Sequence, residues 1–166
     1  MAFTVSTLTP NHAMAWLYLL REGTRAFPLG FLTSAEEAAE TTETDAQDIL
    51  KHGNFRGVFD STSLIGFCGY RRSPRARLAH RAELGPFFVR AASHRQGAAL
   101  AMLRAVSDEA RSAGVCYLDL SVDTANFRAI RFYERAGFRR LALKPDEVRI
   151  DGIPRDDYLY RLDLET

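Results

Sequence analysis

Cysteine and lysine are both scarce in this chain. Only two of its 166 residues are cysteine, Cys68 and Cys116, and they form neither a CxxC pair nor a spacing that suits a metal. A disulfide framework is therefore not expected, and neither is structural zinc, which needs about four closely placed ligands. We predict that the protein uses no metal. Lysine accounts for only two of the 22 basic residues, which we attribute to genome composition and not to function.

An excess of charge of one sign and a long apolar segment are also missing. The 22 Lys and Arg against 21 Asp and Glu leave a net charge of +1, so nothing draws the whole chain toward nucleic acid or an anionic membrane. The apolar run from Ala13 to Leu20 is far shorter than the ~20 residues that span a bilayer. It also lacks the basic flank and cleavage site of a secretion signal. We expect a cytoplasmic protein with no nucleic-acid or membrane partner.

What remains is an ordinary globular composition. Hydrophobic residues make up 46% and charged residues 26% of the chain, which argues against general disorder. A chain of this length buries about two-thirds of its unfolded surface, so it can fold without disulfides or bound metals to stabilise it. The sequence contains no repeat, low-complexity tract or internal linker, so we predict a single domain over residues 1–166.

Hydrophobic periodicity predicts helices and strands in the rough order βααβββαβαββ. The predicted strands cover residues 3–8, 56–60, 63–71, 81–89, 115–122, 138–143 and 158–164. The first helix starts near Pro10, and the others cover residues 34–51, 96–113 and 125–136. We expect a polar loop around Pro145 and Gly152 between the last two strands.

The connections between strands predict how they pair. A helix links the strand at 81–89 to the strand at 115–122. Such a crossover returns the chain in the same direction, so these two strands should be parallel. The earlier strands are joined by short turns and should be antiparallel. We therefore predict an α/β (α+β) fold with a mixed, mostly antiparallel sheet that is flanked by helices and contains one parallel pair.

Several common catalytic motifs are absent. The sequence has no G-x-S-x-G, G-x-x-x-x-G-K-[ST], H-E-x-x-H or G-x-G-x-x-G pattern. These absences argue against the usual hydrolase, nucleotide-hydrolysing, metalloprotease and dinucleotide-binding sites.

The junction between a strand and a helix at residues 89–100 is the first candidate binding segment. A hydrophobic strand end, Phe87-Phe88-Val89, leads through a polar turn to Gly97-Ala98-Ala99. Small residues let a ligand approach the backbone, and the free N–H groups of a first helical turn bind phosphate. The alternative is a helix start that merely packs closely on the sheet.

A second segment resembles a known family. Residues 126–138 read NFRAIRFYERAGF. They match N-x-x-A-x-x-x-Y-x-x-x-G-F, the late signature of the GNAT superfamily of acetyl-CoA-dependent N-acetyltransferases, at every marked position. The family's earlier signature, a strand ending in Val and then [RQ]-x-x-G-x-[GA], is similar to Val89 followed by HRQGAA. Here His94 departs from the usual Arg or Gln, Ala91 stands where Pro is common, and Ala99 replaces the second Gly.

The resemblance implies that acetyl-CoA is the co-substrate and assigns its contacts. In the family the parallel strands splay apart, and the backbone of Phe88 and Val89 would hold the pantetheine arm, with the Val89 N–H polarising the thioester carbonyl. His94 either contacts a phosphate or is a plain turn residue. The pyrophosphate would lie on the N–H groups of Arg95, Gln96, Gly97, Ala98 and Ala99.

The late signature implies two further roles. Asn126 would hydrogen-bond the pantetheine arm, and Tyr133 would protonate the departing thiolate. The two residues are seven positions apart, which places them two turns along one helix face. As alternatives, Asn126 is a helix N-cap and Tyr133 a core aromatic residue.

Glu83 is the candidate base that removes a proton from the acceptor. It stands six residues before Val89 on one predicted strand, and even spacing places both on one face. Its position resembles that of the base Glu in the protein-lysine acetyltransferase branch. The pair Gly85-Pro86 argues for a bulge that would turn Glu83 away. An exposed structural Glu, with a water relay as the base, is the alternative.

The predicted activity is the transfer of acetyl from acetyl-CoA to a small-molecule or peptide amine, by direct attack in a ternary complex. One alternative is an acyl-CoA-binding sensor or assembly module of the same fold. Another is nucleic-acid binding by the basic stretch Arg71–Arg81. The acidic second helix either attracts a cationic amine or is simply a soluble face. The acceptor's identity and the formation of a homodimer are left open.

Overall fold

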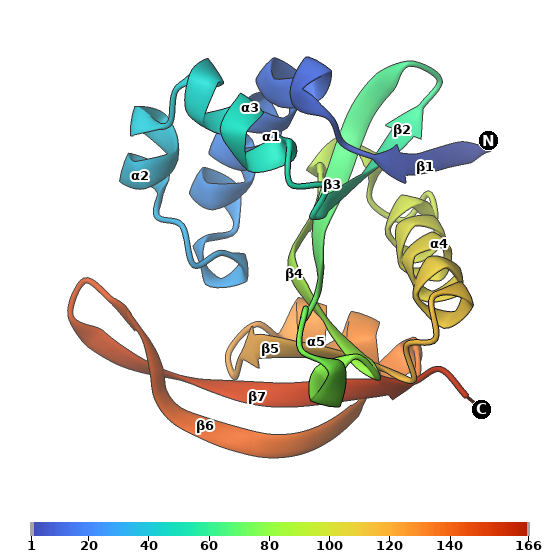
Figure 1. The fold of residues 1–166 in the computed structure, drawn as a ribbon. Helices are drawn as coiled ribbons and strands as arrows, with labels where there is room; N and C mark the ends of the chain where they lie inside the picture. The colour runs from blue at the N-terminus through green and yellow to red at the C-terminus, as the bar shows by residue number, and fades with distance from the viewer. Residues whose placement is uncertain (1, 166) are drawn as a thin grey trace. The chain divides into compact units, whose positions relative to one another are not determined.

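The computed structural model describes residues 2–165, in which seven strands form one mixed sheet (Figure 1). The strands are β1 (Phe3–Thr7), β2 (Phe55–Asp60), β3 (Ser63–Arg72), β4 (Arg81–Val89), β5 (Tyr117–Asp123), β6 (Arg139–Ile150) and β7 (Ile153–Asp163). Their order across the sheet is β1-β2-β3-β4-β5-β7-β6. β4 and β5 are parallel, whereas β1–β2, β2–β3, β5–β7 and β6–β7 are antiparallel. The predicted mixed sheet with one parallel pair is confirmed.

The helices follow the predicted order with one exception. They are α1 (Ala13–Ala26), α2 (Ala35–Glu40), α3 (Glu43–Leu50), α4 (Ala98–Ser112) and α5 (Phe127–Arg135). The prediction of one unbroken helix from Ser34 to Lys51 is wrong, because α2 and α3 share that segment. Two capping boxes explain the break. Ser34 and Glu37 exchange hydrogen bonds at the start of α2, and Thr42 and Asp45 do so at the start of α3. A second N-cap forces a second helix start.

The chain divides into two compact units. The first comprises the residues up to Tyr70 together with Pro86–Val106, and the second comprises Arg71–Gly85 and the residues from Ser107 onward. β4 and α4 contribute residues to both units. The single domain expected from the sequence stays a prediction.

In the first unit an aromatic cluster fixes the end of β4. α1, α2 and α3 lie on one side of β2 and β3 (Figure 1). Trp16 of α1 packs edge-on against Phe55 and Phe67, with ring centroids 5.2 and 5.8 Å apart. Phe88, near the end of β4, packs on Phe67 and Phe31 at 6.1 and 5.9 Å. Full burial of such a side chain stabilises a fold by about 1.5–3 kcal/mol, so the strand end is held firmly in this core.

In the second unit β6 and β7 form one long hairpin. The sequence predicted two shorter strands and a polar loop around Pro145 and Gly152, and this is corrected. The chain turns at Asp151 and Gly152, whose φ values are 51° and 76°. Pro145 lies within β6, and the register shifts between Lys144 and Val148. A proline is tolerated there because β6 is an edge strand, where a missing N–H breaks no ladder.

α5 packs on the strands of the second unit. Tyr160 of β7 is fully buried, and its hydroxyl donates a hydrogen bond to Glu134 of α5 at 2.8 Å. Gly137 ends the helix with a φ of 98°, close to the side chain of Leu162. None of the helices found in residues 2–165 is long and apolar enough to cross a membrane.

Candidate active site

The turn between β4 and α4 presents a row of backbone N–H groups. Residues 94–97 form the turn, and α4 begins at Ala98. Arg95 and Gly97 adopt left-handed conformations with φ values of 64° and 88°, and Gln96 between them does not. Among the described residues, no acceptor bonds to the N–H groups of residues 95–98. Successive N–H groups in such alternating conformations, next to a helix N-terminus, form a concave site for an anion.

Gly97 keeps the space above this turn open. A Cβ atom built at Gly97 meets nothing within 4 Å, and the positive φ is one that glycine adopts without strain. A phosphate can therefore approach the backbone directly. The residues present fit the pyrophosphate of a coenzyme, as the sequence predicted for Arg95 to Ala99. Coenzyme binding itself stays a prediction.

His94 ties the turn to the end of β4. Its Nε2 lies 2.6 Å from the carbonyl oxygen of Val89, and its ring lies 5.9 Å from that of Phe27. A carbonyl only accepts hydrogen bonds, so Nε2 donates here. This geometry gives His94 a structural part in the turn, in line with the second of its two predicted roles. A phosphate contact stays a prediction.

Phe88 and Val89 are held by a close approach to β3. A Cβ atom at Gly66 would lie 2.6 Å from the carbonyl oxygen of Phe88 and 2.8 Å from a methyl of Val89, so a larger residue would displace the strand. The N–H of Arg90 donates to the carbonyl of Ile65 at 2.9 Å. The backbone predicted to hold the pantetheine arm is thus well fixed.

Asn126 and Tyr133 both belong to α5 and its cap, in the second unit. Asn126 is the N-cap, and its Oδ1 accepts a hydrogen bond from the N–H of Ala129 at 3.3 Å. Tyr133 is 8% exposed and packs edge-on against Phe132 and Phe138. Both residues therefore have structural roles of the kind weighed from the sequence. The cap uses Oδ1 of Asn126. The roles of both residues toward the coenzyme stay predictions.

Glu83 is exposed on β4 and lies in register with Asp119 of β5. Gly85 has a φ of 133°, an irregularity at the position where the sequence predicted a bulge. The role of Glu83 as the base stays a prediction. The parallel register covers three pairs and ends at Glu83–Asp119.

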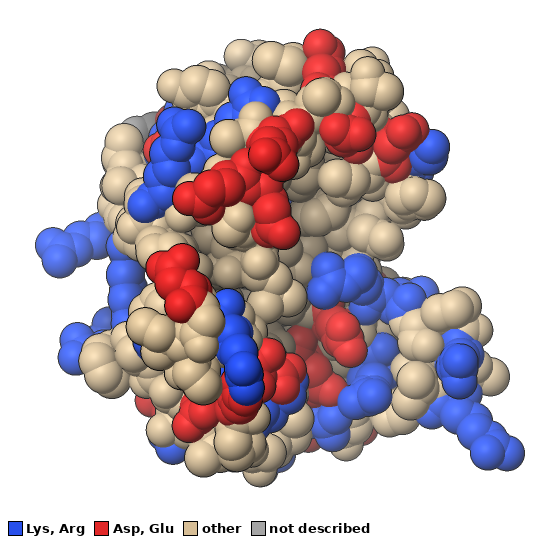
Figure 2. Space-filling view, turned by 90° about the vertical axis from the view of Figure 1, so that its left-hand side faces the viewer, with Lys and Arg blue, Asp and Glu red and all other residues tan. Residues whose placement is uncertain are grey.

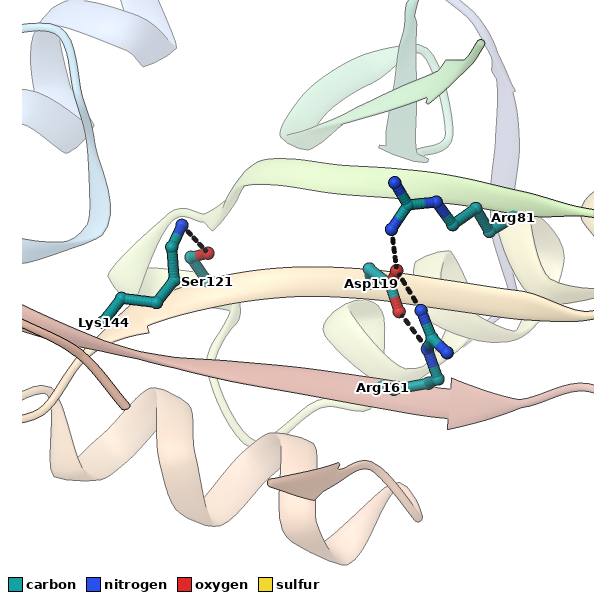
Figure 3. Close-up of polar contacts among 5 residues, drawn as sticks. All are labelled: Arg81, Asp119, Ser121, Lys144 and Arg161. Atoms are coloured by element: carbon teal, nitrogen blue, oxygen red, sulfur yellow. Dashed lines mark hydrogen bonds and ion pairs between the residues drawn. The ribbon is translucent and has the colours of Figure 1, made fainter. Parts of the chain in front are cut away.

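The sequence interpretation missed a charged face on β5 and β7. Asp119 is 4% exposed, and its carboxylate accepts hydrogen bonds from Arg161 at 2.6 and 2.8 Å. Arg81 of β4 approaches the same carboxylate at 3.4 Å, so Asp119 lies between two arginines (Figure 3). The alternating polar residues of β5, at 117, 119, 121 and 123, were a signal for this face. Their partners lie too far along the chain for spacing to predict.

Two further buried aspartates on this face differ in their environment. Asp123 is 6% exposed and receives two hydrogen bonds from Arg155, at 2.5 and 2.8 Å. These bonds are the main reason why the pKa of Asp123 lies below its ordinary value, and the N–H of Ala125 adds to the effect. Asp157 is 7% exposed, and its pKa is raised, chiefly by burial and then by the neighbouring Asp123 carboxylate.

The acidic character predicted for the second helix is carried by α2 and α3. Several acidic groups gather in the upper half of the view in Figure 2. Six acidic residues of these helices are all exposed: Glu36, Glu37, Glu40, Glu43, Asp45 and Asp48. Such a surface promotes solubility and attracts cations.

Known structures share this fold over nearly the whole chain. An acetyltransferase of the GNAT family from Streptococcus pneumoniae is 16% identical, with a TM-score of 0.84 over 98% of this chain and 99% of that chain. Ribosomal-protein-alanine N-acetyltransferase from Brucella melitensis is also 16% identical, with a TM-score of 0.83 over 96% and 99%. The protein yncA from Salmonella typhimurium, whose structure includes its cofactor acetyl-CoA, is 15% identical, with a TM-score of 0.81 over 99% and 95%.

At these identities the structural matches establish the fold alone. No curated protein sequence matches the chain significantly. The profile of the acetyltransferase (GNAT) family, however, matches residues 16–138, which include β4, the turn, α4, β5 and α5. The chain therefore belongs to the acetyltransferase (GNAT) family.

Proposed function

We propose that this protein transfers the acetyl group of acetyl-CoA to an amine by direct attack in a ternary complex. The observation that carries the proposal is the turn that leads into α4, where the backbone N–H groups of residues 95–98 have no acceptor among the described residues and Gly97 leaves the approach open. The family match and the related structure with acetyl-CoA support the choice of coenzyme.

Acetyl-CoA supplies an activated acetyl thioester when it is bound. The N–H groups of residues 95–99 offset the charge of its pyrophosphate, and the backbone of Phe88 and Val89 holds the pantetheine arm. The Val89 N–H donates to the thioester carbonyl, where negative charge develops. Asn126 donates its side-chain N–H to the arm, which leaves its capping oxygen in place.

Two proton transfers accompany the reaction. An ammonium has no lone pair, so a base must first take a proton from the acceptor, and the sequence offers Glu83 or a relayed water for this task. The phenol of Tyr133 then protonates the departing thiolate. We place this activity in the cytoplasm and expect no nucleic-acid or membrane partner.

A second candidate function is an acyl-CoA-binding module without turnover. The structural roles of Asn126 as an N-cap and of Tyr133 as a packed aromatic favour it, because both residues have a reason to be present without catalysis. The match to the complete late signature favours the enzyme.

Two measurements test the proposal and separate these candidates. A ligand that binds only the folded state stabilises it by about 2.7 kcal/mol at a hundredfold excess over Kd, so saturating CoA should raise Tm by several degrees. An unchanged Tm would remove the coenzyme assignment.

A screen of amines with acetyl-CoA, in which the release of free thiol is measured, then detects turnover. The screen should include a peptide with an N-terminal alanine, because of the Brucella melitensis relative. A Tm shift without thiol release from any amine would favour the binding module.

A further inference from the structure

One face of the sheet in the second unit gathers charged side chains from three strands. Asp123 of β5 lies opposite Asp157 of β7, and Asp157 lies opposite Lys144 of β6. Directly opposed residues of paired strands point to the same face of a sheet. The Nζ of Lys144 reaches the Oγ of Ser121 at 3.3 Å across this face (Figure 3). Asp157 therefore points to the same face, between Asp123 and Lys144.

Three aspartates on this face are buried, but only two of them are neutralised. Asp119 and Asp123 each accept two hydrogen bonds from an arginine. Asp157 is 7% exposed and has no hydrogen-bond donor or ion-pair partner anywhere in residues 2–165. The nearest opposite charge in register, Lys144, is bound to Glu147 instead. Asp157 is thus a largely buried carboxylate to which no cation in residues 2–165 is directly bonded.

Burial and the neighbouring charges both favour the binding of a cation to Asp157. Burial of a carboxylate without a partner is costly, and burial is the main cause of its raised pKa. Asp123 of β5 and Glu147 of β6 raise the pKa further, whereas Lys144 of β6 and Arg155 of β7 lower it. An added group with one positive charge and several N–H donors would satisfy this carboxylate. An ammonium has both properties.

The charged side chains around this carboxylate are partly exposed. The side chains of Lys144, Glu147 and Arg155 are 34%, 37% and 27% exposed, so the groups around Asp157 border solvent. Figure 2 shows red and blue side chains interleaved in the lower half of the view.

We propose that Asp157 binds the ammonium group of the acceptor amine and accepts its proton. The inference rests on the proposed function and adds the residue that binds and deprotonates the acceptor amine. The proton passes to a carboxylate oxygen of Asp157, and the electron pair of the N–H bond stays on nitrogen. The neutral amine attacks the thioester carbonyl carbon, and the C–S bond breaks. The thiolate takes a proton from Tyr133, and the amide nitrogen loses its extra proton to solvent.

The direct test follows the carboxyl carbon of Asp157 by NMR in protein with isotope-labelled aspartate. The resonance of Asp157 is the carboxyl resonance that is lost in Asp157→Asn. A pH titration is recorded in butylammonium chloride and in sodium chloride at equal concentration. Butylammonium should lower the pKa of Asp157 by about one unit, which corresponds to about tenfold tighter binding to the ionised form. Asp151, exposed at the hairpin turn, is the internal control and should not shift. Equal pKa values of Asp157 in the two salts would overturn the proposal.

A kinetic test adds the proton transfer. On an acceptor from the amine screen, Asp157→Asn should lower kcat/KM by about 10²-fold or more at neutral pH. Part of the loss should return at high pH, where more amine arrives neutral. The matched control Asp151→Asn removes the same charge from the same hairpin and should keep the wild-type rate. A wild-type rate for Asp157→Asn would refute the base role. Failure here together with an intact Tm shift by CoA would overturn this inference and leave the proposed coenzyme site standing.

Discussion

The two regions that carry binding chemistry are built in different ways. The turn at residues 94–97 offers backbone N–H groups, whereas the face of β5, β6 and β7 offers side chains in a fixed register. The turn forms although Ala91, His94 and Ala99 all depart from the common family pattern. A backbone site tolerates changes of side chain as long as the φ values at Arg95 and Gly97 are kept. A side-chain site depends on individual residues, and this difference can be tested.

The largest expected effect comes from a charge at the backbone site. Gly97→Asp should abolish the Tm shift caused by CoA, because a carboxylate would stand where a phosphate belongs. Asp and Asn are the residues that best tolerate a positive φ after glycine, so the protein without ligand should stay folded. Thermal melts with and without CoA measure the effect.

Gly97→Asn is the matched control for this prediction. It has the same size and a similar tolerance of φ, but no charge, and it should keep a reduced Tm shift. If Gly97→Asp and Gly97→Asn reduce the Tm shift by CoA equally, the size of the side chain and not its charge causes the loss, and the anion site is not supported.

The second effect concerns a side chain in α5. Tyr133→Phe keeps the ring that packs on Phe132 and Phe138, so the Tm shift with CoA should be unchanged. Loss of the proton donor should lower kcat by about 10²-fold, near the low end for general acid catalysis, because a thiolate can leave without help. Single-turnover and steady-state rates on one acceptor measure it. A wild-type kcat would make Tyr133 a packing residue only.

A smaller effect is expected at Glu83. This residue is exposed and lies on β4 beside Asp119, which two arginines already neutralise. Since Asp157 is proposed as the base, Glu83→Gln should lower kcat only a few-fold, and the pH profile should keep its shape. A large loss at neutral pH that recovers at high pH would instead make Glu83 the base, as the sequence first indicated.

The two regions also differ in how far sequence alone could predict them. The strand, the turn and the glycine at residue 97 are adjacent in the chain, so local pattern and family signature were enough to predict the donors from Arg95 to Ala99. The charged face depends on β5 pairing with β7, which brings Asp119 to Arg161 and Asp123 to Arg155. Local spacing carries no information on that register.

The errors in the fold have similar causes. The break between α2 and α3 depends on Thr42 and Asp45, a second capping box inside a segment that otherwise favours helix. The long hairpin of β6 and β7 depends on Pro145 lying on an edge strand. The helix break depends on a local capping interaction, and the long hairpin depends on the position of β6 in the sheet. Hydrophobic periodicity predicts neither. The order of the other elements followed from periodicity because their apolar patterns are regular.

The smallest effect compares two aspartates of the charged face through stability. The folded-state pKa of Asp123 is lowered, mainly by Arg155, so its contribution to stability is present above its ordinary pKa of about 3.9. That contribution is lost as pH falls through the folded-state value. The pKa of Asp157 is raised by burial, so its ionised form destabilises the fold at neutral pH, and the penalty disappears as pH falls below the raised value.

In thermal melts at neutral pH, Asp123→Asn should therefore lower Tm, whereas Asp157→Asn should leave it unchanged or raise it. The two Tm values should converge toward wild type in acid. An equal loss of Tm in both variants at neutral pH would mean that Asp157 has a stabilising partner, and the contrast between the two aspartates would fail.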